Sequence, residues 1–504
     1  MVLGGRNGMG VIKFRLPPND IGRRLASQRK AYMTGLDRTP GRLGLEFRDD
    51  LMLCTRESGE SARLFVPWPI AGFGAPFVGT ATLGERPEPY ALALELARGK
   101  LNDVRNQAAD WTQMGLRVGP NFTETLRKAH RAFVRAAVSG DDADVRLAAS
   151  RESLAESSRA GDLLTDAYAV QVLQTRLAST GKLTTSLGCS LAGDPDKTPG
   201  SARWSSAMNA AQVGVSWRDL APTEGKYRWE LLDAQIAWCR KHRLKIEAGP
   251  LIEFRPSTMP DWIWLWAGDA ETIAGFATDL ARQAVARYRG KVPVWRVVHR
   301  PAGHDLLGLG EEDQIRITAR VIQAARQADP AAQLCLGVDR PWAEWMSSSR
   351  FQLGPLHLCD YLIRSEVGLS CVSLEIAPGY SSPGSHYRDL FEFSRLLDLY
   401  ALLNVPLHVT LVAPSADGHD PRAESGVEVE AWQWPEAPNE ALQADWAARW
   451  AALAIAKPFV RSVSWLQPGD AVPHLYPHGG LHRADGTPKP AFSRIQALRR
   501  DLIA

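Results

Sequence analysis

Acidic side chains at the ends of apolar, strand-like runs are the residues best suited to chemistry in this chain. Glu253 follows the run at 244–252, and Glu375 lies near the end of the run at 369–376. Two carboxyl groups that face one cleft can serve as the acid and the nucleophile or base in glycosidic bond hydrolysis. Both glutamates are therefore candidate catalytic residues, although a salt bridge or a loop hydrogen bond is the alternative role. Further acids of this kind are Asp305, Asp339 and Asp470.

Three histidines near the carboxyl terminus, His474, His478 and His482, recur every four residues. Imidazole is a common zinc ligand, and this spacing would place the three rings on one face of a helix. Pro473, Pro477 and two glycines interrupt any helix there. We therefore expect solvent-exposed loop histidines and no metal site. The chain also has no Gly-rich nucleotide-binding motif, so no cofactor is expected.

An alternation of strand-like and helical patterns positions these side chains, and it begins near residue 183. Eight runs are continuous and apolar, which is typical of strands buried on both faces of a parallel sheet. Helical patterns separate most of them. The pattern predicts a (β/α)8 TIM barrel over 183–504, with chemistry at the carboxyl ends of the strands. The runs are 184–191, 212–217, 244–252, 292–299, 333–339, 369–376, 406–413 and 460–466.

An open, doubly wound sheet is the alternative architecture. The absence of a Gly-rich phosphate-binding loop after any strand weakens this alternative. The long acidic, Pro-rich segment at 413–439 follows the seventh strand, where barrel enzymes carry loops that cover the substrate. Its Trp432 and Trp434 either cap a cleft or anchor the loop.

The first 182 residues have a different character. Short strand-like runs occupy about 43–83, and helical spacing dominates about 90–179. This order predicts a smaller α+β domain, with sandwich-like strands followed by two or three helices. No residue spacing in it suggests catalysis. We interpret it as an accessory or scaffolding domain, with carbohydrate binding as the alternative.

Several segments of the predicted barrel follow a known order. They are WRDLAPTEGKYRWELLDAQIAWCRKHRLKI at 217–246, PLIEFRPSTMPDW at 250–262, PVWRVVHRPAG at 293–303, PLHVTLVA at 406–413, VRSVSWL at 460–466 and GGLHRADGTPKPAF at 479–492. In order and spacing they resemble the family-10 glycoside hydrolases, the endo-β-1,4-xylanase family. The resemblance implies a TIM barrel that acts on the O-glycosyl bonds of a β-linked polysaccharide such as xylan. Residues 1 to about 180 lie outside it.

The resemblance also implies where two catalytic carboxylates should stand, and neither is present. Arg300, preceded by His299, occupies the acid/base position, and an arginine cannot donate a proton near neutral pH. Leu411 occupies the nucleophile position and has no nucleophilic atom. Other sugar-binding positions have changed as well: Val213, Ser216, Gly249, Glu375 and Ala377. Two tryptophans are retained, Trp217 and Trp465.

Three functions remain open. The leading hypothesis is a catalytically degenerate member that binds a glycan through Trp217, Trp262, His299, Arg300 and Trp465. The second is an active hydrolase with relocated acids, because Glu253 and Glu375 are three strands apart, as the family pair is. The third is a structural or interaction protein without glycan contact. A cleft lined by the three tryptophans favours the first, and a plugged cleft favours the third.

Composition limits the binding partners and the cellular location that we expect. The net charge of +3 arises from 59 basic and 56 acidic side chains, so no nucleic-acid or membrane partner is expected. The 17 tryptophans favour sugar platforms or a bulky core. The six cysteines are scattered, which predicts buried free thiols, and no signal peptide or membrane span is evident. We therefore expect a cytoplasmic protein; its oligomeric state is not predicted.

Overall fold

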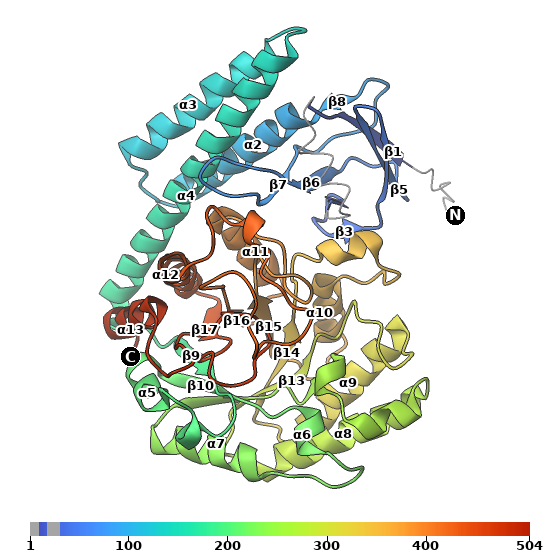
Figure 1. Cartoon of the computed structure of the whole chain (residues 1–504), viewed down its shortest axis with the longest axis vertical. Helices are drawn as coiled ribbons and strands as arrows, with labels where there is room; N and C mark the ends of the chain where they lie inside the picture. The colour runs from blue at the N-terminus through green and yellow to red at the C-terminus, as the bar shows by residue number, and fades with distance from the viewer. Residues whose placement is uncertain (1–9, 18–30) are drawn as a thin grey trace.

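A closed ring of parallel strands forms the larger part of the molecule. The computed structural model describes residues 10–17 and 31–504 (Figure 1). Eight strand positions pair side by side, and β11 pairs with β13 to complete the ring; β12 extends the third position. The predicted TIM barrel is confirmed. Its strands are β9 (Ser186–Ser190), β10 (Ala210–Val213), β11 (Lys245–Ala248), β12 (Ile252–Glu253), β13 (Val294–His299), β14 (Gln333–Val338), β15 (Cys371–Ile376), β16 (Leu407–Leu411) and β17 (Val460–Trp465).

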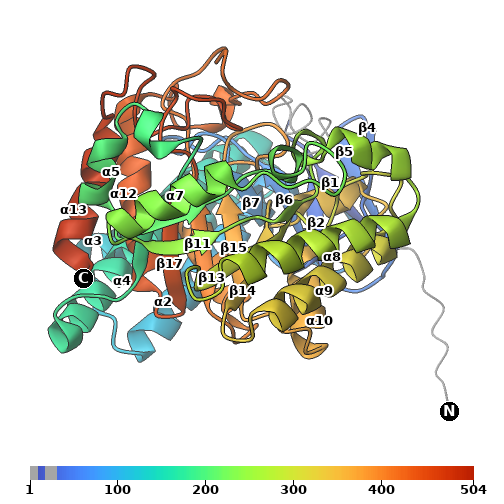
Figure 2. The same ribbon diagram turned by 90° about the horizontal axis from the view of Figure 1, so that it is seen from below.

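Helices cover the outside of the ring, and Figure 2 shows α7, α8 and α9 along one flank. Their apolar stripes pack on the outward-facing strand residues, which gives one continuous core. Two very short helices, α5 (Trp204–Ala207) and α6 (Trp217–Leu220), lie in the loops. The larger helices are α7 (Glu230–Lys241), α8 (Ala270–Arg287), α9 (Glu311–Ala328), α10 (Pro355–Arg364), α11 (Leu390–Ala401), α12 (Glu440–Ala456) and α13 (Pro490–Leu502).

The inward face of the strands is more polar than the sequence pattern predicts. Along β11, β13 and β16, charged residues alternate with apolar ones, and Glu247, Arg296 and His408 are all buried. Arg296 Nη2 donates to Glu247 Oε1 at 2.8 Å, and His408 Nδ1 lies 2.9 Å from Glu247 Oε2. These strands are therefore apolar only on the face toward the helices. The second predicted run also differs, because β10 ends at Val213 and Trp217 already begins α6.

The N-terminal unit, residues 10–17 and 31–180, contains two four-stranded sheets and three helices (Figure 1). One sheet has the order β4-β5-β1-β8 and the other β3-β2-β6-β7, so strands begin well before residue 43. The strands are β1 (Gly10–Arg15), β2 (Tyr32–Thr34), β3 (Pro40–Gly41), β4 (Gly44–Arg48), β5 (Leu51–Arg56), β6 (Arg63–Pro67), β7 (Phe77–Gly79) and β8 (Tyr90–Ala91). The helices are α2 (Leu92–Gln113), α3 (Pro120–Ala137) and α4 (Ala143–Thr180).

Buried polar contacts join the N-terminal unit to the barrel. Lys100 Nζ on α2 donates to Asp389 Oδ2 at 2.6 Å, and both side chains are almost fully buried. The Arg388 guanidinium carbon lies 4.8 Å from the ring centroid of Phe77, and Arg388 donates to the Tyr32 hydroxyl. The long helix α4 continues down the side of the barrel (Figure 1), where Arg449 on α12 pairs with its acids. Removing one partner of such a desolvated pair leaves a buried charge uncompensated, so these contacts favour one fixed placement of the unit on the barrel.

The cysteines depart from the sequence prediction in one place. Cys335 and Cys371, on the neighbouring strands β14 and β15, are joined by a disulfide, so the prediction of free thiols is wrong for this pair. Cys54, Cys189, Cys239 and Cys359 are free and buried, as predicted. Because disulfides persist mainly in oxidising compartments, cysteine usage no longer supports the cytoplasmic prediction. In the described part of the chain, no helix combines the length and the apolar character needed to cross a bilayer.

Candidate functional site

A buried arginine occupies the centre of the barrel mouth. Arg300 directly follows β13, and its side chain is fully buried. Its Nε donates to Glu253 Oε1 at 2.9 Å, its Nη1 to Asp339 Oδ2 at 3.0 Å and its Nη2 to Glu375 Oε1 at 2.7 Å. We call these four residues the arginine cluster. One guanidinium thus satisfies three carboxylates from three different strand ends.

The parallel barrel explains why these four side chains meet. Glu253 ends β12, Asp339 follows β14, and Glu375 lies one residue before the end of β15. Because all carboxyl ends of the strands open at one face, their side chains converge on the barrel axis. Arg300 has a φ of 59°, in the left-handed region, and its backbone N–H donates to the Gly337 carbonyl at 3.0 Å. A residue other than glycine is strained in this region, so the surrounding contacts must hold Arg300 in this conformation.

A second layer of polar side chains surrounds the cluster. His299 Nε2 lies 3.0 Å from Glu375 Oε2, and the Tyr476 hydroxyl donates to Glu375 Oε1 at 2.6 Å. Arg255 donates to Glu253 at 3.0 Å and also pairs with Glu424 from the long loop after β16. These contacts fill the mouth with paired charges.

The electrostatics keep the carboxyl groups of the cluster ionised. Burial alone would raise the pKa of Glu375, but Arg300, His299 and Tyr476 outweigh it and lower that pKa to about 2. Burial likewise opposes ionisation of Glu253, yet the charges of Arg255 and Arg300 lower its pKa. The pKa of Asp339 lies well below its usual range for the same reason, with Arg300 as the main opposing charge. None of the three is a proton donor near neutral pH.

The predicted sugar-binding tryptophans lie mainly in the core. Trp217 and Trp465 are each 2% exposed, and Trp465 Nε1 donates to the Gly479 carbonyl at 2.8 Å. Trp262 is partly buried against Trp217, with ring centroids 6.1 Å apart, and its Nε1 donates to the Ala221 carbonyl. His299 and Arg300 are buried as described. Therefore Trp217 and Trp465 provide packing rather than an exposed stacking surface.

The remaining residues predicted from the sequence do not belong to the arginine cluster. Asp305 is exposed and pairs with Arg350, away from the cluster, and Asp470 pairs with Lys489 at 2.5 Å. Leu411 ends β16 and is buried. In the long loop, Trp434 is buried against Tyr387 and anchors the segment, whereas Trp432 is 42% exposed.

The prediction of solvent-exposed loop histidines is wrong. The His474 and His482 side chains are 3% and 1% exposed, and that of His478 is 22% exposed. His474 Nε2 lies 2.9 Å from Asp420 Oδ2, which also accepts the backbone N–H of His478. Backbone turns bury these rings without a helix, because the loops after β16 and β17 pack on each other. His474 also lies with Asp420 and Asp470 in a group that could hold a metal ion.

A cavity of about 210 Å³ lies beside the cluster at the barrel mouth. We call it the mouth cavity. Arg340 connects the two, since its Nε donates to Asp339 Oδ2 at 3.1 Å while its guanidinium carbon lies 5.5 Å from the Trp345 ring centroid. Sequence reasoning missed this cavity, because its residues come from the loops after β14, β15 and β16 and from β7 of the N-terminal unit. It is lined by Phe77, Arg340, Glu344, Trp345, Ser347, Ser348, Tyr380, Ser381, Ser382, Gly384, His386 and Glu430.

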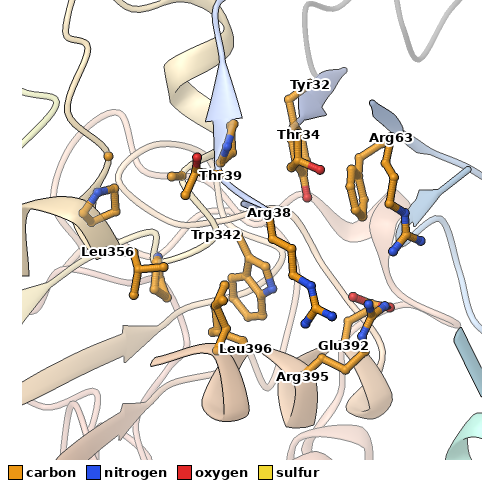
Figure 3. Close-up of a pocket in the computed structure, with 17 residues that line it drawn as sticks. Tyr32, Thr34, Arg38, Thr39, Arg63, Trp342, Leu356, Glu392, Arg395 and Leu396 are labelled. Carbon is orange, nitrogen blue, oxygen red and sulfur yellow. The ribbon is translucent and has the colours of Figure 1, made fainter. Parts of the chain in front are cut away.

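A smaller cavity of about 80 Å³ lies between the N-terminal unit and the barrel (Figure 3). Arg38, Arg63 and Arg395 line it beside Trp342. Arg63 and Arg395 both donate to Asp103 at 2.6 Å, and Arg395 also donates to Glu392 at 3.1 Å, so both arginines already have acidic partners. The cavity therefore belongs to the interface between the N-terminal unit and the barrel.

Gly337 on β14 lies close to His299 beside the arginine cluster, and this contact gives a first prediction. A Cβ at Gly337 would lie 2.2 Å from His299 Nδ1, and Glu375 holds that ring in place. Gly337→Ala should therefore lower the free energy of unfolding by about 1–3 kcal/mol, measured by urea denaturation. The control is Gly275→Ala on α8, where the added Cβ meets nothing and should stabilise the helix by about 0.5–1 kcal/mol. Equal stability of the Gly337 variant and the wild type would refute the close approach.

Several solved structures are similar to this chain at low sequence identity. No protein-family model matches the chain. It is similar to native xylanase 10B from Thermotoga maritima, at 14% identity over 64% of this chain and 96% of that one, with a TM-score of 0.48. It is also similar to a GH10 endoxylanase from a sugarcane soil metagenome, at 18% identity over 62% and 97%, with a TM-score of 0.49. A third similar structure is GH10 from Paenibacillus barcinonensis, at 17% identity over 66% and 98%, with a TM-score of 0.48. These likenesses concern the barrel and assign no activity to this chain.

Proposed function

We propose that this chain is a family-10-like barrel protein that binds a β-linked glycan such as xylan without hydrolysing it. The observation that carries the proposal is the pairing of Arg300 with three carboxylates. Arg300 stands where the resemblance implies the acid/base, and Leu411 stands where it implies the nucleophile. Hydrolysis by two carboxylates needs one proton donor and one nucleophile or base at the scissile bond. Neither position supplies such a group.

The ion pairs and the lowered pKa values of Glu253 and Glu375 argue against catalysis by these two residues. Both face one centre, but both are bonded to Arg300, and both pKa values are lowered. A general acid needs a raised pKa so that it carries its proton near neutral pH. Both carboxyl groups are also almost fully covered, so a sugar ring would have to displace the arginine to reach them.

The mouth cavity is the place where we expect a glycan to bind. Its arginine, glutamate, histidine and serine side chains can hydrogen-bond sugar hydroxyls, and its aromatic rings can pack against the apolar face of a sugar. Trp345 is only partly buried there. Glu344 Oε1 is used by the His386 backbone N–H, whereas Glu344 Oε2 has no hydrogen-bond partner among the described residues. This oxygen is itself buried, so a sugar hydroxyl can donate to it only when the Glu344 side chain turns toward the cavity.

The test is calorimetric titration of the full chain with xylo-oligosaccharides and with β-glucan oligosaccharides. The wild type should bind one of them without releasing sugar, and Trp345→Ala should weaken its affinity at least tenfold, equivalent to about 1.4 kcal/mol. The matched control is Trp264→Ala, since Trp264 is 40% exposed outside the mouth cavity. Equal weakening in both variants would exclude the mouth cavity as the binding site.

One alternative has an observation in its favour. The arginine cluster plugs the barrel mouth, Trp217 and Trp465 are buried, and the N-terminal unit packs across the neighbouring loops. By the criterion set from the sequence, a plugged cleft favours a structural or interaction protein. The proposed glycan binding rests instead on the mouth cavity beside the cluster. The same titration separates the two functions. If the wild type binds no glycan, the proposed glycan binding is wrong and the structural role takes its place.

A further inference from the structure

Two cysteines and a histidine meet inside the amino-terminal half of the barrel, away from the arginine cluster. Cys335 is the third residue of β14, Cys371 the first of β15 and His408 the second of β16. The three strands are neighbours, and Cys335 pairs in register with Cys371. All three side chains are buried, and their ligand atoms lie within 4.8 Å of one another.

The spacing of the donor atoms suits a tetrahedral metal ion. His408 Nδ1 lies 3.7 Å from Cys335 Sγ and 2.9 Å from Glu247 Oε2. Zinc bound at about 2.3 Å to sulfur and about 2.1 Å to nitrogen holds these two ligand atoms about 3.6 Å apart. We propose that reduction of the Cys335–Cys371 disulfide creates a binding site for a thiophilic divalent cation such as Zn²⁺, with Cys335, Cys371 and His408 as the protein ligands. A water molecule takes the fourth position, and Glu247 lies beside the site against His408.

Electrons, protons and charges balance when the disulfide is reduced and the cation binds. A dithiol reductant supplies two electrons and two protons to the Cys335–Cys371 bond and itself becomes a disulfide. Binding of the cation then releases both thiol protons to solvent, and His408 coordinates through Nδ1 with its proton on Nε2. The two thiolates and Glu247 carry three negative charges. The divalent cation and the Arg296 guanidinium, which already pairs with Glu247 at 2.8 Å, balance them.

A path from solvent reaches this site. A cavity of about 480 Å³ is lined by residues at or beside the start of β9, β10, β11, β13, β14, β16 and β17, so it lies at the amino-terminal end of the barrel. Glu247 and His408 are part of its wall. A hydrated cation can therefore meet the Glu247 carboxylate and the His408 ring before it reaches the sulfur atoms. This inference does not depend on the proposed function, since the mouth cavity and this site share no residue.

The test uses Co²⁺ as a spectroscopic probe on the full chain, in its oxidised form and after anaerobic reduction. Reduced wild type should bind one equivalent of Co²⁺ with strong sulfur-to-cobalt absorption, and Zn²⁺ should displace it. Oxidised wild type should show no such absorption. Cys371→Ser and His408→Ala should each weaken Co²⁺ binding at least tenfold, whereas Cys359→Ser, a buried free cysteine on α10, should leave it unchanged.

A second measurement needs no variant and guards against variants that fail to fold. Zn²⁺ should raise the melting temperature of the reduced wild type more than that of the oxidised wild type, because only the reduced form has the cysteine site. Any binding at Asp420, Asp470 and His474 would contribute equally to both forms. The proposal is wrong if reduced wild type shows no sulfur-to-cobalt absorption, if Zn²⁺ raises its melting temperature no more than that of the oxidised wild type, or if Cys359→Ser weakens binding as much as Cys371→Ser.

Discussion

Arg300→Met should lower the free energy of unfolding by about 3–5 kcal/mol, because it removes the guanidinium that three buried carboxylates share. Among the described residues, Arg300 alone contacts Glu253, Asp339 and Glu375 together, and it is fully buried. The other charged partners of these acids each contact only one of them. Methionine fills a similar volume but offers no donor, so the carboxylates would have to be protonated or take up water. Urea denaturation at neutral pH measures the loss.

A matched control separates this effect from the loss of any arginine. Arg282 on α8 is exposed and pairs only with Asp279 one turn away, so Arg282→Met should change stability by less than about 0.5 kcal/mol. A double variant, Arg300→Met with Glu375→Gln, should recover part of the loss because it removes one unpaired charge. If Arg300→Met unfolds at the wild-type urea concentration, the cluster does not carry the charges assigned to it.

The second large effect is a dependence of stability on acid. The folded pKa of Glu375 is about 2, below its ordinary value of 4.5. A lowered folded pKa contributes stability that is complete above the unfolded pKa and is lost as the pH falls through the folded one. The contribution of Glu375 is therefore about 3 kcal/mol at neutral pH and should vanish between about pH 4.5 and pH 2.

Glu375→Gln isolates this contribution from the other acids. The stability difference between wild type and Glu375→Gln should be large at neutral pH and should shrink steadily below about pH 4.5. Glu271→Gln is the control, because Glu271 is 66% exposed and its variant should track the wild type at every pH. A difference that stays constant down to about pH 3 would contradict the lowered pKa of Glu375.

Periodicity and turn residues were enough to predict the barrel. Seven of the eight predicted runs contain or overlap their observed strand closely, and the run at 212–217 overlaps β10 only at its first two residues. There the polar Ser216 caps α6, since its side chain accepts the Asp219 backbone N–H, and this local bond ends the extended segment. The early strands β1 and β2 were missed. β1 pairs with a partner more than 25 residues away, and β2 is only three residues long and pairs with both β3 and β6.

The candidate site was predictable in part. Chemistry in a barrel lies at the carboxyl ends of its strands, and this rule predicted Glu253, Asp339 and Glu375. The structure brings all three to Arg300. The rule could not reveal that one arginine neutralises them, because side-chain pairing between strands is not encoded in local spacing. The polar interior of the barrel was also missed, since Arg296 and His408 stand within apolar runs and their inward direction emerges only from the closed ring.

The measurement that tests the central claim most directly is sugar release by the purified full chain. Xylans, β-glucans and aryl glycosides would be incubated with the wild type beside Glu253→Gln/Glu375→Gln, with an active xylanase as the positive control. Because no group of the arginine cluster can donate a proton near neutral pH, we expect no release by either form during long incubation. Turnover by the wild type that the double variant loses would contradict the account and show that the two glutamates catalyse hydrolysis.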